Sequence, residues 1–200
     1  MTPMAEARIL ACVAWLLAVA GCADSPPPIL YRLLDDPAPS AVRSPPGTDV
    51  VAIAPVRLPD RVDRARLVVI GDDGRVVADD SRRWAEPLPI AVEELLARRL
   101  AASMTGTWIA RDRVGPVPDP RLRIALVVDE VDARLGGRVV VSARWVIADR
   151  RHERTRLGDV VVEDLARQPG YDGLVVALRR ALEKVCDDVV ADARNLQPAD

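Results

Sequence analysis

The chain has 200 residues, of which 50% are hydrophobic and 29% are charged. Its formal net charge of -2 leaves no basic excess of the kind that nucleic-acid-binding proteins carry. With Cys12 and Cys22 of the N-terminal segment set aside, one histidine and one free cysteine are too few for the usual structural zinc clusters. The composition therefore favours one ordinary folded domain, with no nucleic-acid partner, no metal and no cofactor.

The N-terminus has the pattern of a secretory signal peptide. A short head with Arg8 as its only basic residue precedes an apolar run that begins at Ile9, and small residues lead to Cys22. The run is shorter than the ~20 apolar residues that a membrane-spanning helix needs. We therefore expect residues 1–21 to be a signal peptide and residues 22–28, with three consecutive prolines, to be an extended tether.

Residues 19–22, with the sequence Val-Ala-Gly-Cys, resemble the lipobox of bacterial lipoproteins. The resemblance implies a diacylglyceryl thioether on Cys22, cleavage before it and acylation of the new amino terminus by a fatty acid such as palmitate. Three acyl chains, at ~0.8 kcal/mol per buried methylene, anchor a protein firmly. Ala23 then implies the outer membrane and its periplasmic side, unless Asp24 is the residue read for sorting. The alternative is an ordinary signal peptide in which the cysteine has no role.

The folded domain is expected to span residues 29–195, with residues 196–200 as a C-terminal tail. Its N-terminal part alternates short apolar runs with proline-rich loops. The predicted strands are residues 29–34, 50–56, 67–70 and 75–78. The last two flank an Asp-Gly pair, which is typical of a β-hairpin. The strand over 50–56 is expected to end or bulge at Pro55, because proline cannot donate a ladder hydrogen bond.

A helix is predicted over residues 87–104. Leucine, valine and methionine recur there at helical spacing and form one apolar stripe. Glu93, Glu94 and Arg98 fall on the opposite side, which we expect to be solvated. Two prolines suit the first turn, and Gly106 follows as a stop signal.

The C-terminal part is dominated by alternating patterns. We expect a short strand over 108–110, an antiparallel hairpin of strands 122–128 and 139–147, a third strand over 155–162, and a second helix from Tyr171 or Asp172. The order of strands, helix, strands and helix is typical of an α+β fold. The sequence predicts a two-layer sandwich, with two helices on one face of a mostly antiparallel sheet.

Several segments together resemble the ABC-type transport auxiliary lipoproteins, and most closely the PqiC-like (paraquat-inducible protein C-like) members of that family. They are residues 31–33, 53–59, 64, 83–88, 143–145 and the closing helix from Tyr171, together with the lipobox. Residues 84–88, Trp-Ala-Glu-Pro-Leu, are the most specific of these. The likeness extends over nearly all of the mature chain, so it also implies the fold of the ABC-type transport auxiliary component.

The resemblance implies a non-enzymatic role at the outer membrane. Members of the family work with a mammalian-cell-entry (MCE) protein, which forms a tunnel across the periplasm from an inner-membrane partner, in lipid transport or membrane integrity. Family analogy also suggests a ring of identical subunits that caps the tunnel. The alternatives are an auxiliary component of an MCE ABC transporter, a structural lipoprotein that plugs or chaperones an outer-membrane assembly, and a lipid-anchored hydrolase.

No catalytic residue is predicted. His152 is the single histidine and lies in a charged turn, where a solvated side chain is expected. No Gly-x-Ser-x-Gly elbow is present. Adjacent carboxylates occur at 72–73, 79–80, 93–94 and 187–188, and we interpret them as hairpin and helix surface charge. No Walker-type glycine loop occurs either, so any ATP hydrolysis belongs to a partner.

Two adjacent arginines precede a tryptophan near the end of the first hairpin. Arg82 and Arg83, beside Trp84, are a candidate for partner docking or for a cation–π contact. In the alternative interpretation, Trp84 plugs the end of the sheet.

Cys186 is the cysteine that remains once Cys12 leaves with the signal peptide and Cys22 is lipidated. An internal disulfide is then excluded in the mature chain. Its place on the helical pattern predicts a small buried thiol, and the alternative is an intermolecular disulfide.

Overall fold

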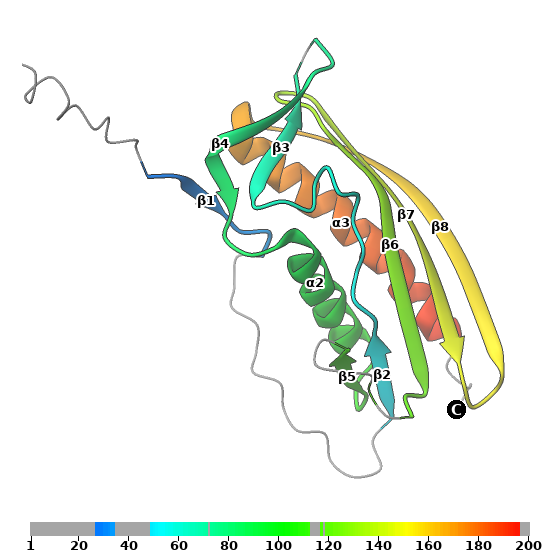
Figure 1. The fold of residues 1–200 in the computed structure, drawn as a ribbon. Coiled ribbons are helices and arrows are strands. Elements are labelled where there is room, and N and C mark those ends of the chain that lie inside the picture. Colours follow the sequence, from blue (N-terminus) through cyan, green and yellow to red (C-terminus); the bar gives the residue numbers. More distant parts are fainter. Residues whose placement is uncertain (1–26, 35–48, 72, 113–116, 118, 197–200) are drawn as a thin grey trace, which may run out of the picture.

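Three long strands make up most of the larger of two sheets (Figure 1). The computed structural model describes residues 27–34, 49–71, 73–112, 117 and 119–196. The three strands are β6 (Leu122–Ala133), β7 (Arg138–Asp149) and β8 (Arg154–Leu165). They pair antiparallel in chain order. The predicted hairpin is confirmed, and each strand is longer than its predicted apolar run because the alternation continues through polar residues.

A β-bulge halfway along β6 changes which residues face the core. Up to Val128 the even-numbered residues are buried, whereas Val131 and Ala133 are buried after it. The register against β7 shifts between Val128 and Glu130. Because a bulge adds one residue to its strand, it keeps apolar side chains on the inner face along the full length of β6.

Two short strands extend this sheet in the parallel sense. β2 (Val50–Ile53) lies between β5 (Trp108–Arg111) and β6 and runs parallel to both. The strand order is β5-β2-β6-β7-β8, so the sheet is mixed, with antiparallel pairing along its longest strands. As the sequence indicates, β2 stops before Pro55, and pairing with β6 resumes at Arg57.

The predicted hairpin of the N-terminal part lies in a second sheet of three strands. It pairs β3 (Arg66–Ile70) with β4 (Val76–Trp84) in the antiparallel sense. Gly74 in the turn has φ of 77°, a conformation that favours glycine. β1 (Ile29–Tyr31) adds to the outer edge of β4 and runs parallel to it, so the first predicted strand is shorter than residues 29–34.

Two helices cover the inner face of the larger sheet. α3 (Gly170–Asn195) packs on β7 and β8, and α2 (Leu88–Ser103) packs on α3 and β5. With 26 residues, α3 is about 39 Å long, which is enough to span these strands (Figure 1). The predicted α+β class with two helices on one face is therefore confirmed, with the strands distributed over two mixed sheets.

One side of α2 differs from the prediction. Glu93 is only 2% exposed, and the Glu94 side chain is only 12% exposed. The prediction of a solvated face at these two residues is therefore wrong. Glu94 is shielded from solvent because β5 packs along α2. Arg111 of β5 pairs with the Glu94 carboxylate at 2.7 Å.

The core is one continuous cluster of aliphatic side chains that joins both sheets and both helices. Cys186 lies inside it and is fully buried, as predicted for a small buried thiol. Burial raises the pKa of this thiol, so its reactive thiolate form is disfavoured.

Candidate docking site

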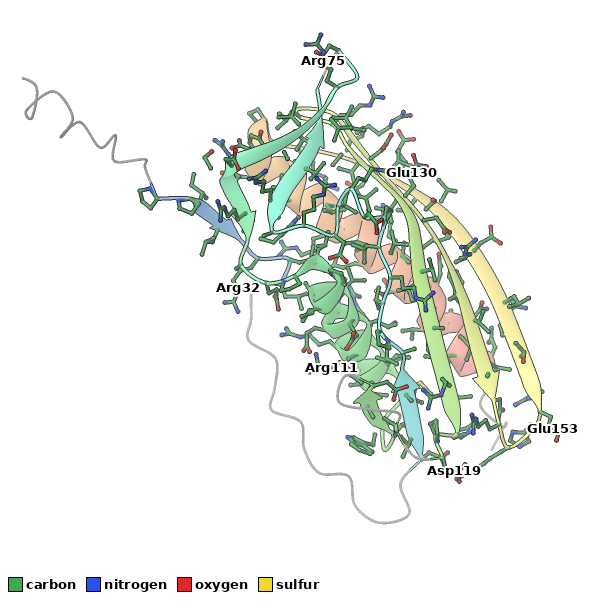
Figure 2. All side chains as sticks on the ribbon, viewed as in Figure 1. Arg32, Arg75, Arg111, Asp119, Glu130 and Glu153 are labelled. Carbon is green, nitrogen blue, oxygen red and sulfur yellow. The ribbon has the colours of Figure 1, made fainter. Side chains whose placement is uncertain are left out.

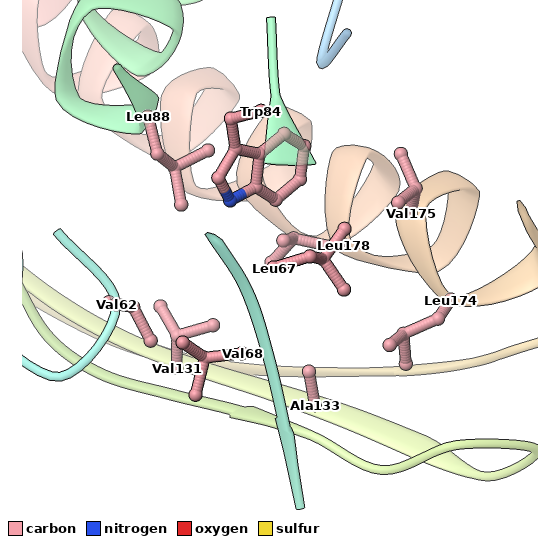
Figure 3. A pocket seen from close by; sticks show the side chains of 10 residues that line it. All are labelled: Val62, Leu67, Val68, Trp84, Leu88, Val131, Ala133, Leu174, Val175 and Leu178. Carbon is pink, nitrogen blue, oxygen red and sulfur yellow. The ribbon is translucent and has the colours of Figure 1, made fainter. Parts of the chain in front are cut away.

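Trp84, the last residue of β4, is part of the core. It is 8% exposed, and its indole lies between the two sheets and the first turns of α3, close to Leu88 and Leu178 (Figure 3). The cavity that remains beside it is apolar and has a volume of about 10 Å³. A space of this size holds roughly one water molecule, so it offers no room for an acyl chain.

Arg82 takes part in a polar cluster beside this tryptophan. Its guanidinium lies 4.2 Å from the centre of the Tyr171 ring, so its cation–π partner is a tyrosine of α3. Its Nη1 donates to Asp79 Oδ2 at 2.6 Å. Hydrogen bonds from Ser81 contribute most to holding the pKa of Asp79 well below its usual range. Arg82 is thus engaged inside the domain.

A second contact ties β1 to the start of α3. Tyr31 Oη donates to Asp172 Oδ1 at 2.9 Å, across a separation of 141 residues in the chain. Desolvation by burial and the Asp172 carboxylate both raise the pKa of Tyr31, which keeps its hydroxyl protonated as a donor. We call Tyr31, Asp79, Arg82, Tyr171 and Asp172 the β1 latch. It holds the first strand of the domain on the body of the fold.

Arg83 is the member of the predicted docking trio that faces solvent. Its Nε donates to the backbone oxygen of Asp80 at 3.4 Å, a weak contact in an exposed setting. The structure therefore separates three adjacent residues into three environments. Trp84 is in the core, Arg82 is in the β1 latch, and Arg83 is accessible to a partner.

An apolar stripe that the sequence analysis did not identify lies on β8. Leu157 and Val161 are each 70% exposed and Leu165 is 61% exposed, all on the outer face of the sheet. Val146 of β7 is 40% exposed on the same face. The sequence does contain a signal for this stripe. Residues 157, 161 and 165 are four positions apart, so in a strand they lie on one face, opposite the buried Val162.

β8 is also the edge strand of the sheet. Within the described residues, its backbone groups on the outer side have no neighbouring strand, and such an edge can accept a strand from another protein. Asp159 and Glu163, both exposed, alternate with the apolar residues of the stripe. This arrangement fits a partner segment in which apolar and basic residues alternate.

The remaining candidate residues are distributed over the surface. His152 is exposed in the turn before β8, and its Nδ1 lies 2.9 Å from Oδ2 of the buried Asp149. Asp187 and Asp188 are exposed on α3, as expected. Within the described residues, no three histidine, cysteine, aspartate or glutamate side chains are grouped so that they could hold a metal ion. Cys22 lies outside the described residues.

No helix within the described part of the chain is both long enough and apolar enough to cross a membrane. Among curated proteins, none matches this sequence. The profile of the ABC-type transport auxiliary lipoprotein component family, in contrast, matches residues 31–190.

The fold is shared with known structures, and two of them illustrate the likeness. One, described as an uncharacterized protein, has 18% identity and a TM-score of 0.67, over 84% of this chain and 99% of that one. The other is a Xanthomonas campestris protein of the DUF330 family, with 14% identity and a TM-score of 0.60, over 81% of this chain and 92% of that one. The order of strands and helices agrees with the family match over residues 31–190. The chain belongs to the ABC-type transport auxiliary lipoprotein family.

Proposed function

We propose that this chain is the outer-membrane lipoprotein subunit of an MCE-type, PqiC-like lipid-transport and membrane-integrity system. In this role it is anchored through Cys22 and docks the periplasmic MCE tunnel at the outer membrane. The observation that carries the proposal is the family match over residues 31–190. The lipobox-like residues 19–22 support it. The chain acts without catalysis, and its partners supply the energy.

The β1 latch suits a membrane-tethered protein. Ile29, the first residue of β1, follows Cys22 by seven positions, so an extended tether covers at most about 25 Å. Any pull on the tether reaches β1 first. The Tyr31–Asp172 hydrogen bond connects that strand to α3, the longest helix of the domain. The latch therefore transmits the position of the anchor to the rigid core.

The stripe on β8 suits the docking role. β1 and β8 lie at opposite sides of the domain in Figure 1, so the stripe faces away from the strand that leads to the anchor. Leu157, Val161 and Leu165 offer apolar area, and the interleaved Asp159 and Glu163 favour basic residues on the partner. We assign this surface to a segment of the MCE-domain protein that adds to the β8 edge. Arg83 is a second, separate contact.

The experiment is photo-crosslinking in intact cells. Amine-reactive reagents suit this chain poorly, because Lys184 is its single lysine side chain and lies 3.0 Å from Asp164. A photoreactive amino acid is therefore placed at Val161 in the stripe. The matched control is Val77, which is 45% exposed on β4 in the other sheet. Crosslinked proteins are identified by mass spectrometry.

The proposal predicts an MCE-domain protein crosslinked from Val161 and not from Val77. Recovery of outer-membrane barrel proteins with no MCE-domain protein contradicts the proposal and favours the plug or chaperone role. A photoreactive amino acid placed at Arg83 shows whether the predicted docking residues, Arg82, Arg83 and Trp84, include a contact of their own. A ring of identical subunits, which family analogy suggests, predicts a ladder of crosslinked multimers of this chain in the same samples.

A further inference from the structure

A polar cavity beside α2 is distinct from the apolar space around Trp84. Its volume is about 180 Å³, against about 10 Å³ for the apolar one. It lies where the residues that follow β1 and precede α2 meet the last residue of β5. By volume it has room for on the order of ten water molecules, or for a small polar ligand.

Three guanidinium groups and two carboxylates line this cavity. They are Arg32, Arg98, Arg111, Glu86 and Glu94. If all are ionised, the lining carries a formal charge of about +1. This small positive excess favours a ligand that presents one anionic group to the guanidinium groups, and it disfavours a doubly charged anion, which would meet the two carboxylates.

One wall of the cavity is preorganised. Glu94 accepts from Arg98 Nε at 3.0 Å and pairs with Arg111 Nη1 at 2.7 Å. A guanidinium carries five N–H donors, so the pairing with Glu94 orders the Arg111 side chain without using all of its donors. Arg111, held in this way, presents donors to an anion at low entropic cost.

Two further charged side chains, Arg32 and Glu86, line the cavity. Arg32 makes no ion pair with any residue of the described chain, and the same holds for Glu86. Figure 2 shows Arg32 and Arg111 on the same side of the molecule, along α2. A cation and an anion that have no ion-pair partner among the described residues match a ligand that carries both charges. Leu34 and Ile90 add an apolar surface for carbon atoms.

We propose that this cavity binds a phosphodiester that carries an ammonium group, the chemistry of a phosphoethanolamine headgroup. Arg32 and Arg111 donate to the phosphate oxygens, which suit the planar guanidinium. Glu86 accepts from the ammonium. This site does not depend on the docking role, because it lies on α2 and not on β8. The ligand is either a membrane lipid or its free headgroup, which share this chemistry.

The test is calorimetric titration of the mature lipidated chain, held in micelles of a phosphate-free maltoside detergent. The ligands are dibutyryl phosphatidylethanolamine, dibutyryl phosphatidylglycerol, glycerophosphoethanolamine and inorganic phosphate. Arg32→Gln is the principal variant, and its folding is checked by thermal unfolding. Arg75→Gln, at the far hairpin tip in Figure 2, is the matched control.

We expect the ethanolamine phosphodiesters to bind and Arg32→Gln to weaken them about tenfold or more, with Arg75→Gln unchanged. Glu86→Gln should weaken the ethanolamine ligands and leave the phosphatidylglycerol affinity as it is. If dibutyryl phosphatidylethanolamine binds more tightly than glycerophosphoethanolamine, the natural ligand is a membrane lipid. If the two bind equally, the natural ligand is the free headgroup. Three results would overturn the site assignment. The wild-type chain binds neither of the two ethanolamine ligands, Arg32→Gln binds them with unchanged affinity, or inorganic phosphate binds the wild-type chain as tightly as they do.

Discussion

The indole of Trp145 on β7 covers Gly158 of β8, its direct cross-strand partner. A Cβ atom at position 158 would overlap with three atoms of the indole ring. The ring also donates from Nε1 to Asp192 Oδ2 of α3 at 3.0 Å. Trp145 therefore connects the edge strand, the sheet and the long helix at one point, and glycine at 158 is what gives it space.

Gly158→Ala should destabilise the domain by about 1–3 kcal/mol, because the ring must leave its rotamer or the strands must separate. Urea unfolding, followed by tryptophan fluorescence, measures the change. Gly137→Ala is the control, since a Cβ there meets its nearest atom at an ordinary 3.6 Å. Equal stability of the two variants would show that the indole does not pack on Gly158.

Asp192→Ala should cost about 1–3 kcal/mol, because it leaves the buried indole N–H of Trp145 without its acceptor. The same carboxylate accepts from Arg156 Nε at 3.0 Å, so part of the loss comes from that pair. Arg156→Gln separates the two contributions, since it keeps the indole hydrogen bond. A double variant with the sum of the single effects would contradict a shared network.

The unfolding free energy should fall steeply below pH 4. Burial of Asp149 opposes its ionisation, but hydrogen bonds from Arg154 and His152 outweigh this and lower its pKa from 3.8 to about 2. Because the folded-state pKa is depressed, the stabilisation is complete above pH 3.8 and is lost as pH falls towards 2. The ionised Asp149 carboxylate contributes roughly 2 kcal/mol to the unfolding free energy in this way.

Asp149→Asn should lower stability at pH 7 and flatten the decline between pH 4 and pH 2. The measurement is the unfolding free energy as a function of pH. Asp159→Asn, at an exposed position of β8, should leave the decline unchanged. If Asp149→Asn keeps the full decline of the unfolding free energy between pH 4 and pH 2, another group causes the acid sensitivity. Asp164 is then the next candidate, since hydrogen bonds from Arg180 and Lys184 lower its pKa to about 2.

Tyr31→Phe removes the hydrogen bond to Asp172 and keeps the ring. We expect a loss of under about 1.5 kcal/mol in global stability, because the contact is exposed, and faster local opening of β1. Hydrogen exchange of the amides near residues 29–31 reports that opening. If those amides exchange at the wild-type rate, the latch does not hold β1.

The thiol of Cys186 should not react with an aromatic disulfide reagent in the native mature chain. Its complete burial blocks access and raises its pKa. In denaturant, one thiol per chain should react if the Cys22 sulfur carries lipid. Rapid reaction of the native chain, or a dimer that reducing agent dissolves, would favour the intermolecular disulfide.

Local patterns in the sequence predict most of the elements. The Asp-Gly turn of β3 and β4, the alternation in β6 and β7, and the apolar spacing of both helices depend on neighbours within a few residues. They give the α+β class. The sequence did not predict the β-bulge at Asp129. Its only sign is that the alternation of apolar and polar residues shifts by one position within β6.

Contacts between distant segments could not be predicted in the same way. The parallel pairing of β2 with β5 and β6 joins residues that are more than 50 positions apart, and no local pattern encodes it. The cation–π partner of Arg82 is Tyr171, which lies 89 positions away in the chain. The cavity between Arg32 and Arg111 likewise exists only after β5 and the β1 connection have been placed beside α2.

Metabolic labelling with palmitate, followed by separation of inner and outer membranes, tests the anchored docking role most directly. The proposal predicts that the wild-type chain carries the label and sediments with the outer membrane. Cys22→Ala should lose the label and remain as an uncut precursor. A wild-type chain found free in the periplasm, or label that persists in Cys22→Ala, would contradict the proposed anchor and the docking role that depends on it.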